Sequence, residues 1–145
     1  MIVISDIDGV VFNIEHRLKY LKNKNYEKFY DKTIMEKDVP IKKGLNVLLG
    51  LKQKSSIFIF CTGRPERTRE ITELSLEKLG FDSCPIFMRK DGDYRKSWKI
   101  KPEMVAEILK EYLREEDEVY FIDDDADNVA RVMEKNPKII GIVFK

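Results

Sequence analysis

Residues 2–9, "IVISDIDG", decide the fold of this chain of 145 residues, because a short apolar run ends there in two carboxylates. Asp6 and Asp8 stand two positions apart, and Gly9 follows them. Asp and Gly are common turn residues, so a strand followed by a tight turn explains the stretch without any chemistry. The alternative is that both carboxylates belong to a functional site, and the polar residues elsewhere in the chain favour this alternative.

Five short apolar runs divide the chain, and each is continuous rather than alternating. They cover Ile2–Ile4, Ile57–Phe60, Ile86–Met88, Val119–Ile122 and Ile139–Val143. Continuous runs are typical of strands buried on both faces of a parallel sheet. Helical patterns lie between them, at Gly44–Lys52, Glu66–Leu79, Pro102–Leu113 and Asp127–Lys135. This alternation predicts an α/β fold, a Rossmann-like three-layer sandwich around a five-stranded, mainly parallel sheet.

Residues 14–43, "IEHRLKYLKNKNYEKFYDKTIMEKDVPIKK", interrupt the alternation. They are rich in aromatic and charged side chains and contain no strand-like run. We expect one domain over residues 1–145, with residues 14–43 as a small helical cap above the carboxyl edge of the sheet. A plain connecting helix is the alternative.

Composition limits the classes of protein to consider. Hydrophobic residues make up 43% of the chain and charged residues 37%, which is typical of a globular domain. The net charge of +1 excludes a global basic footprint, so any contact with nucleic acid must be local. Cys61 and Cys84 are expected as reduced thiols. No apolar run is long enough for a membrane span, and the start "MIVISD" lacks signal-peptide features, so we expect a cytoplasmic location.

Polar side chains end four of the five predicted strands. The strand ends read "SDIDG" (5–9), "CTGR" (61–64), "MRKDGD" (88–93) and "IDDDADN" (122–128). Ligands of open α/β sheets bind at this carboxyl edge, so these side chains are expected to converge. Carboxylates gathered there repel one another unless a cation lies among them, and oxygen-only ligands suit Mg²⁺. We therefore expect Asp123→Asn to raise thermal stability in EDTA.

Two carboxylates near a magnesium ion suit phosphoryl chemistry. One carboxylate can attack phosphorus to form an aspartyl phosphate, and the second can protonate the leaving oxygen and then activate water. Thr62 and a lysine would hold the phosphoryl oxygens.

The four motifs occur in the order found in the haloacid dehalogenase (HAD) superfamily of phosphohydrolases, which the chain resembles over nearly its whole length. "DIDGV" matches the first motif, "TGR" the second, a lysine at the start of a later helix the third, and "IDDDADN" the fourth. The resemblance implies Asp6 as nucleophile, Asp8 as general acid/base, Thr62 as phosphate ligand, Lys101 as the residue that orients nucleophile and phosphate, and Asp123 with Asp124 at a Mg²⁺ site. The implied metal ligands are the Asp6 carboxylate, the Asp8 main-chain carbonyl and one of the two later aspartates. Lys99 is the alternative third-motif lysine, but the spacing from "GDYRK" and the position before Pro102 favour Lys101.

A closer resemblance is to the 3′-phosphatase domain of phage-type polynucleotide kinase/phosphatase. Arg17 stands eleven residues after Asp6, Arg64 lies in the second motif, and "GDYRK" (92–96) precedes the third. The resemblance implies that the substrate is a 3′-phosphorylated nucleic-acid end or nucleotide, and it implies these substrate-binding residues: Gly63, Arg64, Arg17, Arg95 and Lys96. Ser97 departs from the pattern, which has an acidic residue there. Arg17 and Arg64 have a simpler interpretation as solvated surface side chains.

Residues 86–101 carry six basic side chains against two acidic ones, with Tyr94 and Trp98 among them. Such a segment either follows a nucleic-acid backbone and stacks on bases, or is a solvated loop whose aromatic rings pack into the core. No phosphate-binding loop of the kinase type occurs in these residues, and no obligate protein partner is inferred.

Two other functions fit parts of the pattern. The first is a small-molecule phosphatase or 5′-nucleotidase with the same catalytic residues. The second is a non-enzymatic phospho-acceptor module resembling a response-regulator receiver, which also gathers aspartates and a lysine on a doubly wound sheet. The Asp6/Asp8 pair and "TGR" count against the receiver, because it has no general acid two residues after its phosphorylated aspartate.

Overall fold

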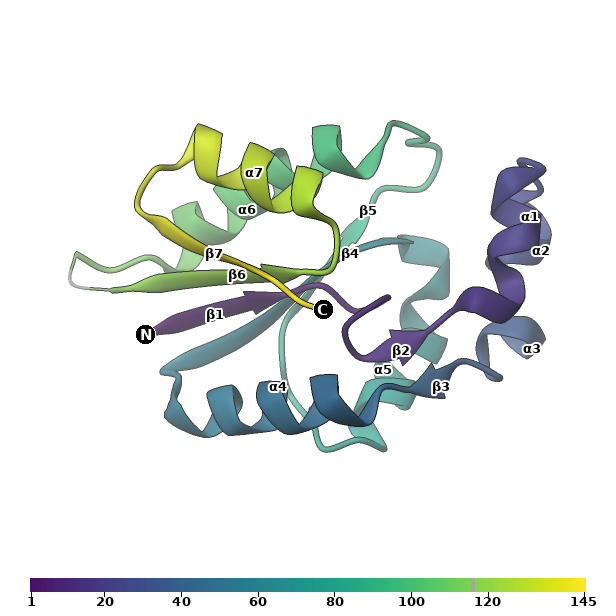
Figure 1. Cartoon of the computed structure of the whole chain (residues 1–145), viewed down its shortest axis with the longest axis horizontal. Coiled ribbons are helices and arrows are strands. Elements are labelled where there is room, and N and C mark those ends of the chain that lie inside the picture. The colour runs from purple at the N-terminus through teal and green to yellow at the C-terminus, as the bar shows by residue number, and fades with distance from the viewer. Residues whose placement is uncertain (116) are drawn as a thin grey trace.

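A computed structural model describes residues 1–115 and 117–145. Its centre is a five-stranded sheet with the order β5-β4-β1-β6-β7 (Figure 1). The strands are β1 (Ile2–Ser5), β4 (Ile57–Pro65), β5 (Ile86–Arg89), β6 (Val119–Asp123) and β7 (Ile139–Val143). Every neighbouring pair is parallel, so the predicted α/β fold is confirmed and its sheet is fully parallel. The first strand lies in the middle, which brings the ends of β4 and β6 to either side of Asp6.

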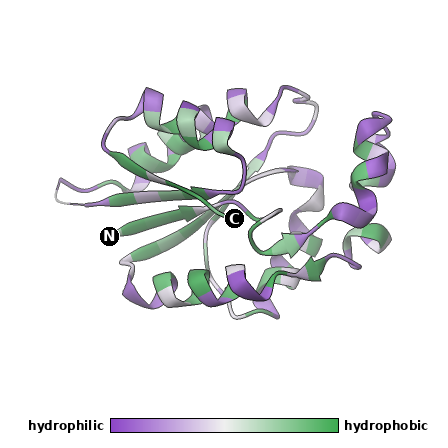
Figure 2. Cartoon of the chain, viewed as in Figure 1, coloured by the Kyte–Doolittle hydropathy of each residue, from purple (hydrophilic) through white to green (hydrophobic). Residues whose placement is uncertain are grey.

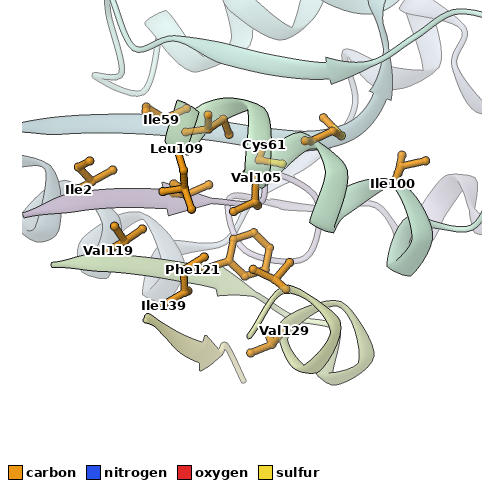
Figure 3. Close-up of a cluster of buried hydrophobic side chains, with 14 residues drawn as sticks. Ile2, Ile59, Cys61, Ile100, Val105, Leu109, Val119, Phe121, Val129 and Ile139 are labelled. Carbon is orange, nitrogen blue, oxygen red and sulfur yellow. The ribbon is translucent and has the colours of Figure 1, made fainter. Parts of the chain in front are cut away.

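Helices cover both faces of the sheet and bury its two sets of side chains. Helices α4 (Lys42–Lys54) and α5 (Arg69–Glu77) pack on one face, and α6 (Ser97–Tyr112) and α7 (Ala126–Lys135) pack on the other (Figure 1). Successive residues of a strand point to opposite faces, so Ile2 joins the cluster under α6 and α7 while Val3 joins the other (Figure 3). The strands are apolar and the outward faces of the helices are polar (Figure 2), as the continuous runs predict.

The cap region contains several short elements rather than one connecting helix. A two-stranded antiparallel ribbon of β2 (Phe12–Asn13) and β3 (Val39–Pro40) forms its base. Between these strands lie η1 (Glu15–Arg17), α1 (Leu18–Lys22), α2 (Tyr26–Phe29) and α3 (Lys32–Met35). They stand at one end of the molecule, beyond the carboxyl edge of the sheet (Figure 1). The ribbon fixes both ends of the insertion at the same point, directly after the Asp6–Gly9 turn.

Helix α6 begins earlier than the sequence pattern indicates. It starts at Ser97, so Pro102 lies inside it instead of in its first turn. Proline has no N–H to donate to the carbonyl of Trp98, but the loss falls near the start of the helix, where few such bonds are affected. Lys101 was expected at the start of this helix, but it lies in the second turn. None of the helices among the described residues combines the length and the apolar character needed to cross a bilayer.

Candidate active site

Three charged side chains meet at the end of the central strand. Asp6 directly follows β1, Asp123 ends the neighbouring β6, and Lys101 reaches them from α6. The Lys101 Nζ atom lies 2.9 Å from Asp6 Oδ1 and 3.0 Å from Asp123 Oδ2, and it also donates to the Cys61 carbonyl at 3.0 Å. All three side chains are buried. The lysine thus bridges the ends of β1, β4 and β6 and holds one oxygen of Asp6 in a fixed direction.

Burial and charge act in opposite directions on this cluster. Burial lowers the pKa of Lys101, but the carboxylates of Asp6 and Asp123 more than compensate and leave it well above its ordinary value. Burial, followed by the charge of Asp123, raises the pKa of Asp6 well above its usual range despite the lowering effect of Lys101. The side chains of this cluster therefore carry two carboxylates for one ammonium.

Asp124 completes an acidic triad that fits a divalent cation. One carboxylate oxygen each from Asp6, Asp123 and Asp124 lies within 4.8 Å of the others. Burial and the charge of Asp123 raise the pKa of Asp124 to about 6, as expected for a carboxyl group close to other carboxylates. The Oδ1 atom of Asn128 is buried nearby without a hydrogen-bond partner among the described residues. Hard oxygen donors, excess negative charge and an unused acceptor match the requirements of Mg²⁺.

The backbone after Asp8 is shaped to admit Asp124. Gly9 has φ +88°, a conformation that favours glycine, and a Cβ atom there would lie 2.1 Å from Asp124 Oδ2. The glycine in "DIDG" therefore permits both the turn and the close approach of the second acidic motif to the first.

Asp8 is not in contact with Lys101 but belongs to a separate network of buried charges. Arg64 donates from Nη2 to Asp8 Oδ1 at 2.7 Å and to Asp38 Oδ2 at 3.0 Å, and from Nη1 to Thr72 at 3.1 Å. Arg17 donates to both oxygens of Asp38, at 2.9 and 3.0 Å, and lies 3.5 Å from Asp8. The side chains of Arg17 and Arg64 are 0% and 2% exposed. They are therefore not solvated surface arginines.

This network keeps Asp8 ionised in the absence of substrate. Burial raises the pKa of Asp8, but the charge and hydrogen bonds of Arg64, with the charge of Arg17, lower it below its ordinary value. The network also connects the cap to the sheet, because Arg17 and Asp38 lie near its two ends and Arg64 lies on β4.

The second motif forms an irregular end to β4. The pairing of β4 with β5 shifts between Thr62 and Pro65, as in a β-bulge, and the hydroxyl oxygen of Thr62 accepts from the Arg64 amide at 3.0 Å. The carbonyl of Gly63 accepts from Arg89 Nε at 2.7 Å and from the Tyr30 hydroxyl at 3.4 Å. Arg89 and Tyr30 thus fix the backbone of the second motif at Gly63.

A cavity of about 690 Å³ opens above these groups. Its lining combines acids and the lysine from the sheet edge, aromatic residues from the cap and the basic loop before α6. The lining residues that matter here are Asp6, Asp8, Gly63, Lys101, Asn128, Tyr26, Tyr30, Arg67, Tyr94, Arg95 and Lys96. This volume is in the range of sites for nucleotide-sized ligands.

The chain matches one known protein family over most of its length. Residues 1–138 match the family described as "Polynucleotide kinase PNKP phosphatase domain". The chain belongs to this family. It is therefore a phosphatase of the HAD superfamily, and the resemblance seen in its motifs is confirmed. A comparison with curated protein sequences found no match.

Solved structures share the fold of this PNKP-type phosphatase. One is described as "Structure of Pnkp1/Rnl/Hen1 complex", with a TM-score of 0.70 and 24% identity; the match covers 98% of the present chain and 45% of that one. A hydrolase from Streptococcus pneumoniae TIGR4 matches with a TM-score of 0.67 and 12% identity, over 99% and 92% of the two chains. A putative beta-phosphoglucomutase from Thermotoga maritima matches with a TM-score of 0.64 and 19% identity, over 99% of the present chain and 86% of that one. The chain spans less than half the length of the chain that it matches in the Pnkp1/Rnl/Hen1 complex.

The site residues predicted for this PNKP-type domain fall into four groups. Asp8 and Gly63 line the cavity, and Thr62, directly before Gly63 in the chain, is buried, absent from that lining and bonded to the Arg64 amide. Asp6, Lys101, Asp123 and Asp124 lie together, as the motifs indicate. Arg17 and Arg64 lie beneath the site, bonded to carboxylates and absent from the cavity lining, so in this conformation they hold Asp8 and do not face the cavity. Arg95 and Lys96 lie at the exposed rim, where Arg95 pairs with Asp93 and Glu103 at 2.9 and 2.8 Å.

Two contributors escaped the sequence analysis. Asp38 bridges Arg17 and Arg64, although its surroundings in sequence, "MEKDVP", resemble a solvated turn. Asn128 donates from Nδ2 to Asp123 Oδ2 at 3.1 Å. The one available signal was the five-residue spacing from Asp123, which places Asn128 on the first turn of α7 facing back toward the strand end.

Proposed function

We propose that the chain is a Mg²⁺-dependent phosphomonoesterase that acts through a phosphorylated Asp6 and removes the 3′-phosphate from nucleic-acid ends or nucleotides. The observation that carries the proposal is the Asp6 carboxylate, held 2.9 Å from Lys101 at the inner end of a nucleotide-sized cavity that Asp8 also lines. A nucleophile and an acid/base group with separate partners is the arrangement that a two-step phosphoryl transfer needs.

In the first step an oxygen of Asp6 attacks phosphorus, and the bond between phosphorus and the ester oxygen breaks. Asp8 gives its proton to the departing oxygen, so an alcohol leaves and an aspartyl phosphate remains. The dianionic substrate next to Asp8 raises the pKa of that carboxyl group by like-charge repulsion and opposes the effect of Arg64, which allows Asp8 to carry the proton. Lys101 directs Asp6, the Gly63 backbone lines the cavity where the phosphoryl oxygens would lie, and Thr62 holds that loop by accepting from the Arg64 amide.

In the second step the roles of Asp8 reverse. The ionised Asp8, now free of the ester, takes a proton from water while the water oxygen attacks phosphorus. The bond between phosphorus and Asp6 breaks, inorganic phosphate forms and the Asp6 carboxylate is restored. The hydrogen bonds from Arg64 favour this ionised state of Asp8 and keep its oxygens in one orientation.

The carboxylates of Asp6, Asp123 and Asp124 would hold the magnesium ion, with the main-chain carbonyl of Asp8 as the further ligand that the family resemblance implies. When bound, the ion supplies positive charge that stabilises the charge on the transferring phosphoryl group. Asn128 supports this assignment, because its Oδ1 atom is a buried acceptor that a water molecule on the ion would satisfy.

Family membership and the basic rim support a nucleic-acid substrate. Lys90, Arg95 and Lys96 line the cavity from one side, and Lys22 and Lys24 from the cap side. Such a rim attracts a phosphate backbone in a protein whose net charge is only +1. Matching chains come from structures described as a Pnkp1/Rnl/Hen1 complex and as the Pnkp1/Rnl/Hen1 RNA repair complex, and we extend that setting to this chain as part of the proposal.

The experiment measures phosphate release with Mg²⁺ from three substrates: a 3′-phosphorylated oligonucleotide, a nucleoside 3′-monophosphate and a 5′-phosphorylated oligonucleotide. Asp6→Asn serves as the blank. Preferential release from the 3′-phosphorylated substrates supports the proposal, and release that persists in Asp6→Asn contradicts the assigned nucleophile. Activity on free nucleotides without activity on oligonucleotides identifies the small-molecule phosphatase instead. Asp8→Asn separates the enzyme from a receiver, because the enzyme loses turnover whereas a receiver still traps phosphate.

A further inference from the structure

An aromatic pair spans the cavity between the cap and the basic loop. Tyr26 begins α2 of the cap, and Tyr94 lies in the loop between β5 and α6. Their ring centroids are 5.2 Å apart and their planes are inclined by 38°. Both rings line the same cavity as Asp6 and Asp8, so the pair belongs to the space that a substrate enters.

Tyr94 presents a ring to solvent although it contacts Tyr26. The residue is 63% exposed, the largest exposure among the exposed large hydrophobic residues of the described chain. A core-packing role is therefore excluded for Tyr94. One side of the ring is supported by Tyr26, and most of the rest remains free for a planar partner.

The loop that carries Tyr94 is fixed relative to the phosphate-binding motif. Arg89 donates from Nη1 to the carbonyls of Asp93 and Arg95, at 3.1 and 2.6 Å. The same guanidinium donates from Nε to the Gly63 carbonyl at 2.7 Å. Because these residues flank Tyr94, its backbone has a set position relative to Gly63, and the contact with Tyr26 orients its ring.

We propose that Tyr94, supported by Tyr26, is a stacking platform for the base of the nucleoside that carries the 3′-phosphate. The proposal rests on the proposed function and specifies its substrate as an unpaired nucleic-acid end. Rings whose centroids are 5.2 Å apart leave no room for a base between them, so the base stacks on the exposed part of Tyr94. The exposed lysines at positions 22, 24, 90 and 96 line the same cavity as this platform and would attract the preceding phosphates.

Stacking predicts a specific kind of selectivity. Every base has an aromatic face, so the platform accepts all four bases but gains nothing from a 3′-terminal sugar without a base. Base–aromatic stacking is worth about 1–3 kcal/mol per base, which corresponds to a roughly 5- to 100-fold preference in kcat/KM.

The test compares two oligonucleotides of the same sequence that end in a 3′-phosphate, one with a normal terminal nucleoside and one with an abasic terminal sugar. The readout is the ratio of their kcat/KM values. Wild type is expected to give a ratio of about 5 to 100, Tyr94→Ala a ratio near 1, and Tyr94→Phe a ratio close to wild type because the ring remains. Tyr20→Ala is the matched control: this cap tyrosine lies outside the cavity lining, and its variant keeps the wild-type ratio.

Each outcome has a distinct meaning. A wild-type ratio near 1 with both oligonucleotides hydrolysed overturns the platform but leaves the 3′-phosphatase intact. A Tyr94→Ala variant that keeps the wild-type ratio also overturns the platform. If wild type releases phosphate from glycerol 2-phosphate but from neither oligonucleotide, the proposed substrate class fails and the platform fails with it.

Discussion

Removal of the Asp38 carboxylate is expected to destabilise the whole domain. Asp38 accepts hydrogen bonds from Arg17 at 2.9 and 3.0 Å and from Arg64 at 3.0 Å, and its side chain is 3% exposed. With Asp8 it balances the two buried guanidinium groups, so Asp38→Ala leaves one buried positive charge without compensation. Breaking a buried ion pair in this way costs about 3–5 kcal/mol.

The loss is measurable by two independent methods. Urea unfolding gives the free energy of unfolding, provided that the m value is unchanged. For a domain of this size the expected cost corresponds to a fall in Tm of roughly 10–15 °C. Since Arg64 also positions Asp8, we expect kcat/KM to fall about 100-fold in the fraction that remains folded. Asp38→Asn keeps the volume and one acceptor oxygen and is expected to lose less stability than Asp38→Ala.

The control is Asp91→Ala, which removes a surface partner of Arg67. Their side chains are 53% and 41% exposed and 3.4 Å apart, so its removal costs at most about 1 kcal/mol. The reasoning is refuted if Asp38→Ala unfolds within 1 kcal/mol of wild type, or if the two variants lose equal stability, because the buried network would then contribute no more than a surface pair.

Three further predictions concern the acidic cluster. The pKa of Asp124 is raised to about 6, so in EDTA the stability that its protonated form contributes in acid is lost as the pH rises from about 4 to above 6. We expect Asp124→Asn to remove this decline and to have a higher Tm than wild type at pH 7.5, as measured by scanning calorimetry. Lys101→Met leaves the carboxylates of Asp6 and Asp123 uncompensated, so we expect a loss of about 3–5 kcal/mol in urea unfolding without Mg²⁺, and addition of Mg²⁺ should recover part of it. Gly9→Ala meets both the positive φ and the Asp124 carboxylate, so it should lower stability by at least about 1 kcal/mol and weaken Mg²⁺ binding in a calorimetric titration; unchanged binding would contradict the role given to this close approach.

The sheet was predictable because its signal is local. Buried parallel strands require continuous apolar runs, and the five runs contain three to five residues each, bounded by turn residues and helical patterns. The predicted start of α6 at Pro102 was wrong because the residues before it, Ser97–Lys101, have no apolar periodicity of their own. Arg89 donates to the carbonyls of Asp93 and Arg95 and so fixes the loop directly before that first turn, and such tertiary contacts leave no mark in a single sequence.

The candidate site was predictable in part for a similar reason. Asp6, Asp123 and Asp124 end adjacent parallel strands, so the fold alone brings them together. The sequence analysis expected Asp123 to carry the repulsion of the cluster. In the structure, burial raises its pKa but Lys101 and the Asp125 and Asn128 donors lower it below its ordinary value, so the excess charge falls on Asp6 and Asp124. Which carboxylate a lysine neutralises depends on the direction of one side chain, and spacing does not encode it.

The position of Asp38 also bears on how a substrate reaches Asp6. Arg17 stands just after the first ribbon strand and Asp38 just before the second, so their hydrogen bonds close the cap at its base. Arg64 continues this connection to β4, and through Asp8 to the turn that carries the nucleophile. Rotating the cap away from the sheet would break several buried charged hydrogen bonds at a cost of several kcal/mol. A substrate is therefore expected to enter the cavity beside the Tyr26–Tyr94 pair, which joins the cap to the basic loop, rather than by cap opening. A disulfide that locks the cap ribbon to the sheet should then leave kcat/KM for an oligonucleotide within about twofold of the reduced form, whereas an enzyme that depends on cap opening would lose its activity on oxidation.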